Sequence, residues 1–389
     1  MDTQKLDQTY IANTYARFPV TIVKGKGSLV WDDTGKEYID LSTGIAVDIF
    51  GVADEEWMAA VTKQLGTLQH ISNLYYTEPC VKLAQMLCEK TGMKKVFFGN
   101  SGAEANECAI KAARKWSEEK KGKDYSTIIT LKNSFHGRTI TTLAATGQDV
   151  FHHDFTPLTE GFVYAEPNDL ADLEQPIKAN KCAAVMMEVV QGEGGVMPLD
   201  EAYVKGAAKL CEQYDLLLIC DEVQVGNGRS GKLYGYMHYG VQPDIVSTAK
   251  GLAGGLPLGA TLLGEKVQDV LSAGTHGSTF GGNPVCCAGA INVLSRLDEK
   301  MLEGVEERSA YIKQELAGAK GVLGVSGLGL MLGIQTEKNA SDIIAACREK
   351  GVLVIKAKDK LRLLPALNIP MEQLQKAVAV IKECCARLL

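Results

Sequence analysis

The sequence predicts an α/β fold, in which a mainly parallel sheet with helices on both faces forms a large domain. Short stretches such as "STIITL" (126–131) and "LLLICDE" (216–222) are almost continuously apolar, which is typical of strands covered on both faces. Segments with helical periodicity separate these stretches; after "GNSG" (99–102), apolar residues follow the spacing of one helical face, namely Ala105, Cys108, Ala109, Ala112, Ala113 and Trp116. Strands that alternate with helices indicate βαβ units and therefore a mainly parallel sheet.

The remaining elements follow in chain order. Residues 20–45 predict an antiparallel hairpin with a turn at Asp33-Thr34-Gly35. Buried strands are expected at 94–99, 126–131, 182–190, 216–222, 243–248 and 259–264, with a helix at 201–214. From about residue 282, helical and apolar stretches and a closing helix at 371–389 indicate a smaller α+β domain. We therefore expect residues 1–50 to contribute to the small domain, 51–281 to form the large domain, and 282–389 to complete the small domain.

Composition excludes several classes of function. A net charge of −6 argues against nucleic acid as a partner. The N-terminal "MDTQKLDQTY" does not resemble a signal peptide, and no apolar run approaches the roughly 18 residues needed to span a bilayer. The eleven cysteines form no CxxC pair and predict reduced thiols, and His152-His153-Asp154 lacks a further ligand with metal-site spacing. The expectation is a cytoplasmic protein without a metal, a membrane segment or a nucleic-acid partner.

Polar side chains follow several of the expected strands, where ligands bind in open α/β sheets. Each cluster alone fits a helix cap or a solvated loop better than a catalytic role. Together, five clusters at one sheet edge indicate a ligand site: Ser101 and Gly102 at a helix start; Phe135, His136 and Arg138; Glu188, Gln191 and Glu193; Asp221 and Glu222; and Lys250.

A glycine-rich segment offers a different interpretation. "GNGRSG" (226–231) matches G-x-G-x-x-G, and Asp244 follows at the distance expected for a ribose-binding acid, which would suggest an NAD-dependent dehydrogenase. That motif requires the glycines to follow a strand directly and to open a helix. Here "DEVQV" (221–225) intervenes, and the sequence that follows is a poor helix former, so the dehydrogenase interpretation is disfavoured.

The five clusters match what pyridoxal phosphate requires of a protein. This cofactor needs a phosphate site at a helix start, a lysine for its aldehyde and a carboxylate at its ring nitrogen. Asp221, at the end of an apolar strand, would supply the carboxylate in a medium of low dielectric constant. Lys250 by itself fits an exposed lysine, but in a dry crevice its amine would be reactive and could move protons.

Several motifs together resemble the class III pyridoxal-phosphate aminotransferases of fold type I. They are "NSGAEANE" (100–107), "FHGRT" (135–139), "QGEGG" (191–195), "AKGLAGGLPLGA" (249–260) and "GSTFGGNPV" (277–285), and the resemblance covers nearly the whole chain. It implies a homodimer with the active sites at the subunit interface. It also implies that Lys250 forms the Schiff base, that Asp221 contacts the pyridine nitrogen, and that further cofactor contacts come from Ser101, Gly102, Ala103, Phe135, Glu222, Val223, Gln224 and, across the interface, Thr279.

The resemblance also implies substrate roles. Arg362 would clamp the carboxylate of glutamate, Glu193 would pair with Arg362 when an ω-amine donor is bound, and Arg138 would hold the far carboxylate of either substrate. "HISNLYY" (70–76) is similar to the members that act on N-acetylornithine, where Asn73 and Ser278 would hydrogen-bond the neutral acyl end. The implied reaction is ping-pong transfer of the ω-amino group from N-acetylornithine to 2-oxoglutarate, in arginine biosynthesis.

Other substrates stay open at this stage. Tyr15 could contact a free ornithine amine, and succinyl-diaminopimelate and 4-aminobutyrate aminotransferases share the same scaffold. A glutamate-1-semialdehyde aminomutase would keep Lys250 and Asp221, but it needs no Glu193–Arg362 switch. One segment departs from the family pattern: "GVADEEW" (51–57) stands where relatives carry G-H-x-H-P, so the sequence leaves the local structure open there.

Overall fold

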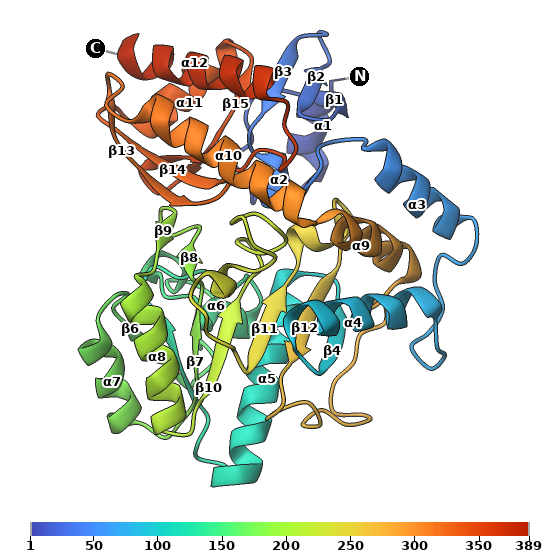
Figure 1. Cartoon of the computed structure of the whole chain (residues 1–389), viewed down its shortest axis with the longest axis vertical. Coiled ribbons are helices and arrows are strands. Elements are labelled where there is room, and N and C mark those ends of the chain that lie inside the picture. Colours follow the sequence, from blue (N-terminus) through green and yellow to red (C-terminus); the bar gives the residue numbers. More distant parts are fainter. Residues whose placement is uncertain (1, 388–389) are drawn as a thin grey trace.

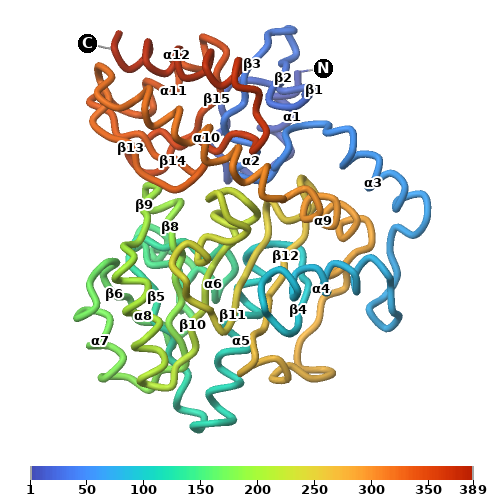
Figure 2. The backbone as a smooth tube through the Cα atoms, in the orientation of Figure 1, coloured from blue at the N-terminus to red at the C-terminus, as the bar shows by residue number. Residues whose placement is uncertain are grey.

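The computed structural model describes residues 2–387, which form a large domain around a central sheet and a smaller domain that contains both ends of the chain (Figure 1). Residue 1 and residues 388–389 of the expected closing helix lie outside the described residues. The backbone trace shows the N-terminal strands beside the C-terminal helices, above the sheet of the large domain (Figure 2).

Within the described residues, the central sheet has seven strands in the order β4-β12-β11-β10-β7-β5-β6. Their bounds are β4 (Lys95–Gly99), β5 (Thr127–Leu131), β6 (Phe162–Ala165), β7 (Cys182–Met187), β10 (Leu217–Asp221), β11 (Ile245–Thr248) and β12 (Gly259–Leu263). β12 is antiparallel to both of its neighbours, β4 and β11, and the other four pairings are parallel. β4 therefore has the same direction as the five remaining strands. The prediction of a mainly parallel sheet is confirmed.

The inner strands are apolar throughout because helices cover both faces of the sheet. Every residue of β7, β10 and β11 is buried. The expected strand 182–190 is interrupted, because the chain leaves the sheet at Glu188 and a short antiparallel pair follows, β8 (Val190–Gln191) with β9 (Met197–Pro198). The sequence analysis did not predict β6, an edge strand of four residues.

Helices precede this sheet in the chain and connect its strands. Those before and within its strands are α1 (Thr3–Tyr10), α2 (Thr43–Ala46), α3 (Glu55–Leu65), α4 (Glu78–Thr91), α5 (Gly102–Lys121), α6 (Ile140–Ala145), α7 (Leu170–Ala179) and α8 (Glu201–Gln213), with the 3₁₀ turns η1 (Asp149–Phe151), η2 (Gly235–His238) and η3 (Lys250–Ala253). In α5 the six apolar residues of the predicted face are all buried, and the Ser101 side chain caps the helix by accepting from the Glu104 N–H.

The smaller domain combines two sheets. In the first, β1 (Ile22–Lys26), β2 (Leu29–Asp32) and β3 (Glu37–Asp40) are antiparallel, which confirms the predicted hairpin, and β15 (Val352–Leu353) joins β3. The second has the order β13-β14-β17-β16, with β13 (Val322–Leu328), β14 (Met331–Thr336), β16 (Ile355–Ala357) and β17 (Lys360–Leu363). The accompanying helices are α9 (Pro284–Arg296), α10 (Glu299–Leu316), α11 (Ala340–Glu349) and α12 (Met371–Arg387); α9 packs on α3, α4 and η3.

The segment "GVADEEW" forms an ordered start of α3. The Asp54 side chain caps the helix by accepting from the Trp57 N–H at 2.9 Å. The same carboxylate accepts from both terminal nitrogens of Arg296, at 2.6 and 3.0 Å. The Trp57 indole N–H donates to the Ala253 carbonyl at 3.0 Å. The residues that replace the family pattern therefore join α3 to α9 and to the turn that begins at Lys250.

This arrangement leads to a stability prediction for Asp54→Ala. The variant loses a helix cap and leaves the half-buried Arg296 without its bidentate partner, so the free energy of unfolding should fall by about 2 kcal/mol. Urea unfolding followed by circular dichroism measures this change. Glu55→Ala is the control, because among the described residues Glu55 forms an ion pair only with the exposed Lys26, and its loss should change the stability by less than about 0.5 kcal/mol. Equal, small effects of both substitutions would contradict the structural role of Asp54.

Candidate active site

A cavity of about 230 Å³ lies where β4, β5, β7, β10 and β11 end. Because the carboxyl ends of these strands share one edge of the sheet, residues far apart in sequence meet there. The lining residues are Gly102, Ala103, Asn106, Phe135, His136, Gly137, Arg138, Glu188, Asp221, Val223, Gln224 and Lys250. Most of the predicted cofactor residues are therefore brought together in one place.

Asp221 ends β10 and is held rigidly in this cavity. Its Oδ2 atom accepts from the Asn106 amide at 2.8 Å and lies 2.8 Å from His136 Nδ1. Since a carboxylate can only accept, the proton of this His136 pair belongs on Nδ1. The Oδ1 atom accepts from the Val223 N–H at 3.0 Å. These three donors fix a nearly buried negative charge at the floor of the cavity.

Lys250 faces the same cavity from the start of η3. Its backbone has a φ of 48°, an uncommon conformation for a residue other than glycine. Burial lowers the pKa of the Lys250 ammonium below its usual range, and the positive charge of Arg362 adds to this effect. The nearby carboxylates of Glu193, Asp221 and Glu188 oppose the shift without reversing it. The amine is therefore more readily deprotonated, as a nucleophile or a proton carrier must be.

Glu188 supports the wall of the cavity. It is almost fully buried, and its Oε1 atom accepts from the Phe135 N–H at 2.8 Å. Burial raises the pKa of Glu188 well above its usual range, and the charge of Asp221 raises it further. The sequence analysis placed Glu188 at the end of a strand but gave it no role. It orients the loop that carries Phe135.

Arg362 and Glu193 form an ion pair beside the cavity. Arg362 lies on β17, is almost fully buried, and donates through Nη1 to Glu193 Oε1 at 2.6 Å and to Gln224 Oε1 at 3.0 Å. Burial opposes the charge on Glu193, but the charge and hydrogen bond of Arg362 prevail and lower the pKa of that carboxyl. Because Gln224 also lines the cavity, this pair borders the space beside Lys250.

Arg138 lies at the exposed rim of the cavity. Its guanidinium is 4.3 Å from the centre of the Phe151 ring and 5.6 Å from that of Phe135. The two rings meet edge to face at 5.9 Å. Aromatic contacts of this kind hold an arginine in place while its donors stay free for an anion.

The start of α5 provides an anion site. The first N–H groups of a helix have no acceptor within the helix, and at this end they face a negative group favourably. Gly102 and Ala103 bring these groups to the cavity wall. A Cβ atom on Gly102 would lie 2.6 Å from Val223 Cγ1, so only glycine fits there.

Ser101 does not line this cavity but caps α5 next to Gly102, and five further predicted residues lie away from the cavity in the described chain. Glu222 is buried on the other side of the strand end, where it accepts from the Gly235 and Tyr236 N–H groups at 2.7 and 2.9 Å, and burial raises its pKa to about 8. The others are Asn73, Ser278, Thr279 and Tyr15. The Asn73 amide donates to the Ser278 and Gly281 carbonyls and so ties loop 70–76 to loop 277–283.

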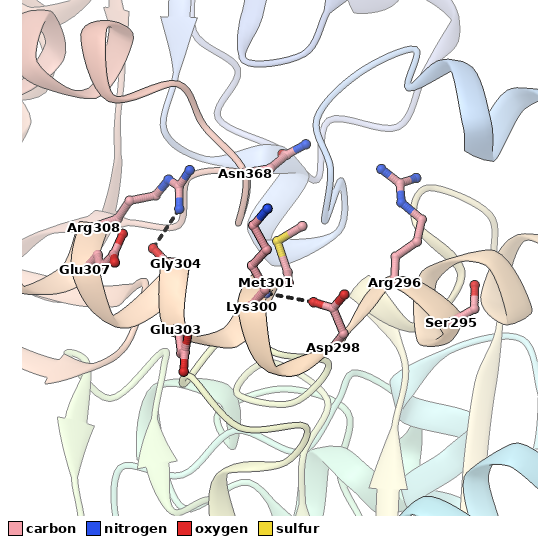
Figure 3. Close-up of a pocket in the computed structure, with 10 residues that line it drawn as sticks. All are labelled: Ser295, Arg296, Asp298, Lys300, Met301, Glu303, Gly304, Glu307, Arg308 and Asn368. Atoms are coloured by element: carbon pink, nitrogen blue, oxygen red, sulfur yellow. Dashed lines mark hydrogen bonds between the residues drawn. The ribbon is translucent and has the colours of Figure 1, made fainter.

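A second, more open cavity of about 680 Å³ lies where α9 gives way to α10 (Figure 3). Both of its arginines are already paired: Arg296 with Asp54, and Arg308 with the Gly304 and Ile369 carbonyls. No group of three or more metal-ligating side chains occurs within residues 2–387. In the same range, no helix combines the length and the apolarity needed to cross a membrane.

A buried lysine, a fixed carboxylate and a helix start around one cavity define the site of a pyridoxal-phosphate enzyme. The chain belongs to the aminotransferase class-III family, whose model matches residues 10–385. It is a pyridoxal-phosphate-dependent aminotransferase, and the predictions of family, fold class and cofactor are confirmed.

Individual relatives show which aminotransferases of this class the chain is similar to. The chain is 49% identical over 387 residues to the acetylornithine aminotransferase of Haemophilus ducreyi, covering 99% of this chain and 98% of the relative. The N-acetylornithine aminotransferase of Stenotrophomonas maltophilia superimposes with a TM-score of 0.86 at 36% identity, covering 99% and 98% of the two chains. An ornithine aminotransferase of Toxoplasma gondii, with partial occupancy of pyridoxal phosphate at its active site, gives a TM-score of 0.94 at 34% identity, covering 98% and 93%.

Proposed function

We propose that this protein is an N-acetylornithine:2-oxoglutarate aminotransferase. The observation that carries the proposal is the pair that Glu193 forms with the buried Arg362 beside Lys250. This pair lets one site accept in turn a reacting carbon without a carboxylate and one that carries a carboxylate. The relatives named acetylornithine aminotransferase, at 40–49% identity over nearly the whole chain, support the choice of substrate.

The residues of the cavity fit pyridoxal phosphate. The N–H groups of Gly102 and Ala103 would bind its phosphate, Phe135 would stack on its ring and Asp221 would meet its ring nitrogen. The cavity contains the buried carboxylate of Asp221 and the buried amine of Lys250. Within the described residues these two groups form no hydrogen bond with each other. When bound, the cofactor accepts the electrons released as a substrate carbon loses its proton.

The donor half-reaction uses the arrangement seen in the structure. While Glu193 is paired with Arg362, the charge of that arginine is neutralised. The region beside Lys250 then neither repels an ω-ammonium group nor contains an unpaired cation that needs a carboxylate from the substrate. Arg138, at the rim, would hold the α-carboxylate of N-acetylornithine. Lys250 Nζ, with its lowered pKa, would take the proton from the ω-carbon of the donor and pass it to the bound cofactor.

The acceptor half-reaction needs Arg362 to be free. In 2-oxoglutarate and glutamate the reacting carbon carries a carboxylate, which the guanidinium of Arg362 can bind through two parallel hydrogen bonds. Glu193 must leave the pair for this to occur, and it is the more exposed partner, at 29% of its side chain against 3% for Arg362. Arg138 would then hold the distal carboxylate.

A homodimer completes the proposal. Large apolar side chains are exposed on the loops that Asn73 ties together: Leu74 at 87%, Tyr76 at 100% and Phe280 at 60%. Such a patch favours burial against a second copy, and Thr279, exposed on the same loop, would then reach the phosphate bound by the partner. Asn73 and Ser278 would face the acyl group from this interface. Light scattering of the purified protein tests this, and a monomeric mass would overturn it.

We also propose a cytoplasmic setting. All eleven cysteines lie within the described residues and are free, nine of them buried. Free thiols in this number favour a reducing compartment.

The substrate is tested by visible absorption of the holoenzyme. N-acetylornithine, ornithine and glutamate are added separately while the band of the bound cofactor is followed. We expect N-acetylornithine to bleach the band at the lowest concentration. Bleaching by ornithine or an acylated diaminopimelate at far lower concentration would keep the mechanism and replace the substrate, whereas a reconstituted protein without such a band would contradict the role of Lys250.

Glu193→Ala tests the switch. Removing the carboxylate leaves Arg362 buried and unpaired whenever an ω-amine donor is bound, at a cost of about 2 kcal/mol. We therefore expect kcat/KM for N-acetylornithine to fall about 30-fold, while kcat/KM for glutamate is unchanged or rises. Glu193→Gln keeps a hydrogen-bond acceptor for Arg362 without the negative charge. Its kcat/KM for N-acetylornithine should lie between that of the wild type and that of Glu193→Ala. An unchanged preference between the two substrates would refute the switch.

A further inference from the structure

Arg229 is a fully buried cation that the proposed mechanism does not use. It lies in the loop "GNGRSG" (226–231), between the central sheet and the smaller domain, and none of its surface is exposed. Its Nη1 atom donates to the carbonyls of Leu330, at 3.2 Å, and of Pro365. Its own carbonyl accepts from the Leu330 N–H at 2.9 Å. Arg229 therefore binds two separate segments of the smaller domain.

These two segments flank the strands that position Arg362. Leu330 immediately precedes β14, and Pro365 follows the end of β17. Arg362 lies on β17 and is paired with Gly333 of β14. The contact at the turn before β14 is tight: Gly329 has a φ of 51°, and a Cβ atom there would lie 2.5 Å from the Arg229 carbonyl oxygen. Arg229 thus connects the β14–β17 pair to the large domain, which also carries Glu193 and Gln224.

Stability alone does not account for an arginine at this position. Its Nε and Nη2 atoms are buried without a hydrogen-bond partner among residues 2–387, and unpaired buried donors destabilise a fold. Burial lowers the pKa of Arg229 to about 9, which shows that the surroundings disfavour the charge. An apolar side chain of similar length would avoid both penalties, but it could not hold two carbonyls at fixed positions.

Two glycines of the loop, Gly228 and Gly231, serve the same contact. Gly228 has a φ of 84°, and a Cβ atom there would lie 2.9 Å from side-chain atoms of both Leu297 and Leu367. On Gly231 a Cβ atom would lie 2.0 Å from Glu306 Oε1. The G-x-G-x-x-G pattern of this sequence therefore lets the loop pack closely on the smaller domain and does not form a nucleotide site.

We propose that Arg229 is a positioning residue, which fixes the β14–β17 strand pair on the large domain and so determines where Arg362 meets the carboxylate of 2-oxoglutarate or glutamate. This inference rests on the proposed function. Two-point binding of a carboxylate by a guanidinium depends on its placement to within a fraction of an ångström. The donor half-reaction is less demanding, because Glu193 is a protein side chain on the large domain that can follow a displaced Arg362.

Arg229→Met in the holoenzyme tests the proposal through the split between the two substrates. We expect KM for 2-oxoglutarate to rise about tenfold and KM for N-acetylornithine to change less than about twofold. A readout without turnover is the dissociation constant of glutarate, a dicarboxylate with no reactive group, measured by calorimetry; it should rise by a similar factor. Arg308→Met is the matched control, because Arg308 also donates to a carbonyl of segment 365–369, that of Ile369, but its hydrogen bonds within residues 2–387 include neither Leu330 nor Pro365.

The results for the Arg229 variants distinguish a residue that positions Arg362 from one that only supports the fold. An equal loss for both substrates, or unchanged glutarate binding, would show that Arg229 only supports the fold and would overturn the proposal. If Arg229→Met does not fold, Arg229→Lys, which keeps the charge but loses the fork of donors, is judged by the same split. Failure of the proposed function would appear in the wild-type enzyme as lack of reaction with N-acetylornithine. The amine that the enzyme does use then takes the place of N-acetylornithine in the experiment. The change in its KM is compared with the change in KM for 2-oxoglutarate, and this comparison still tests the role of Arg229.

Discussion

Replacing Lys250 with alanine is expected to lower kcat by about 10⁵-fold or more while the protein remains folded. Lys250 Nζ is the one buried amine among the residues that line the cavity, so in the described chain no other lining lysine can take its place. In the proposed mechanism the amine would both hold the cofactor and move the substrate proton, and alanine can do neither. Single-turnover absorption with N-acetylornithine measures the loss.

The fold should tolerate this change because the buried ammonium does not stabilise it. In the apoprotein the pKa of Lys250 is lowered, so the native state binds fewer protons than the unfolded state between that pKa and about 10.4. Lys250 therefore costs stability at lower pH, and the cost disappears as the pH rises through this window. The free energy of unfolding of apo Lys250→Ala should exceed that of the wild type most clearly near neutral pH.

A lysine elsewhere provides the control. Lys266 is about half exposed and pairs with Asp244 at 3.1 Å, away from the cavity. Lys266→Ala should leave kcat within about twofold of the wild type. Retained transamination by Lys250→Ala, or equal losses in the two variants, would contradict the assigned role.

Asp221→Asn is expected to lower kcat by about 10²- to 10³-fold. Asparagine has the same shape but no charge, so in the proposed arrangement the ring nitrogen of the cofactor would lose the partner that keeps it protonated. It also brings an amide N–H toward His136 and Asn106, both of which donate to the carboxylate of the wild type. A shift of the visible band of the bound cofactor should accompany the loss of rate.

Asp244→Asn is the matched substitution. Asp244 precedes β11 at the opposite edge of the sheet, where its carboxylate accepts from the Leu218 N–H at 2.9 Å, and asparagine can keep that bond. We expect its kcat to stay within about twofold of the wild type. If Asp221→Asn were equally active, the charge at the floor of the cavity would not contribute to catalysis.

Hydrophobic patterns predicted the strands of this fold better than their directions. "LLLICDE" and "GATLLG" are equally apolar because both strands are buried on both faces, yet β10 is parallel to its neighbours and β12 is antiparallel. Periodicity reports burial and not direction. The four residues of β6 carry too short a pattern to stand out.

The sequence predicted most of the residues that line the cavity and that we propose to touch the cofactor, but it did not predict the residues that hold them in place. Lys250 and Asp221 follow apolar strands, which is a recognisable signal. The sequence signal for Asn106 is weaker, because it is only a polar residue next to the apolar face of α5. Its hydrogen bond to Asp221 joins that helix to β10, and such a contact cannot be read from the sequence. Thr279, Ser278 and Asn73 lie away from the cavity of their own chain, and a single sequence contains no information on the geometry of a second copy.

The reversed direction of β12 has a consequence for how the length of the chain can vary. Because β12 is antiparallel to β4, its first residue, Gly259, lies opposite Gly99, just before the start of α5. A Cβ atom on Gly259 would lie 2.2 Å from the Ser101 carbonyl. The short stretch from Lys250 to Gly259 is therefore a spacer between the lysine and the phosphate site. Homologous chains should differ in residues along this spacer, for example at the exposed Pro257. An insertion or deletion within it would change the distance between Lys250 and the start of α5, the two groups that we propose to hold opposite ends of the cofactor.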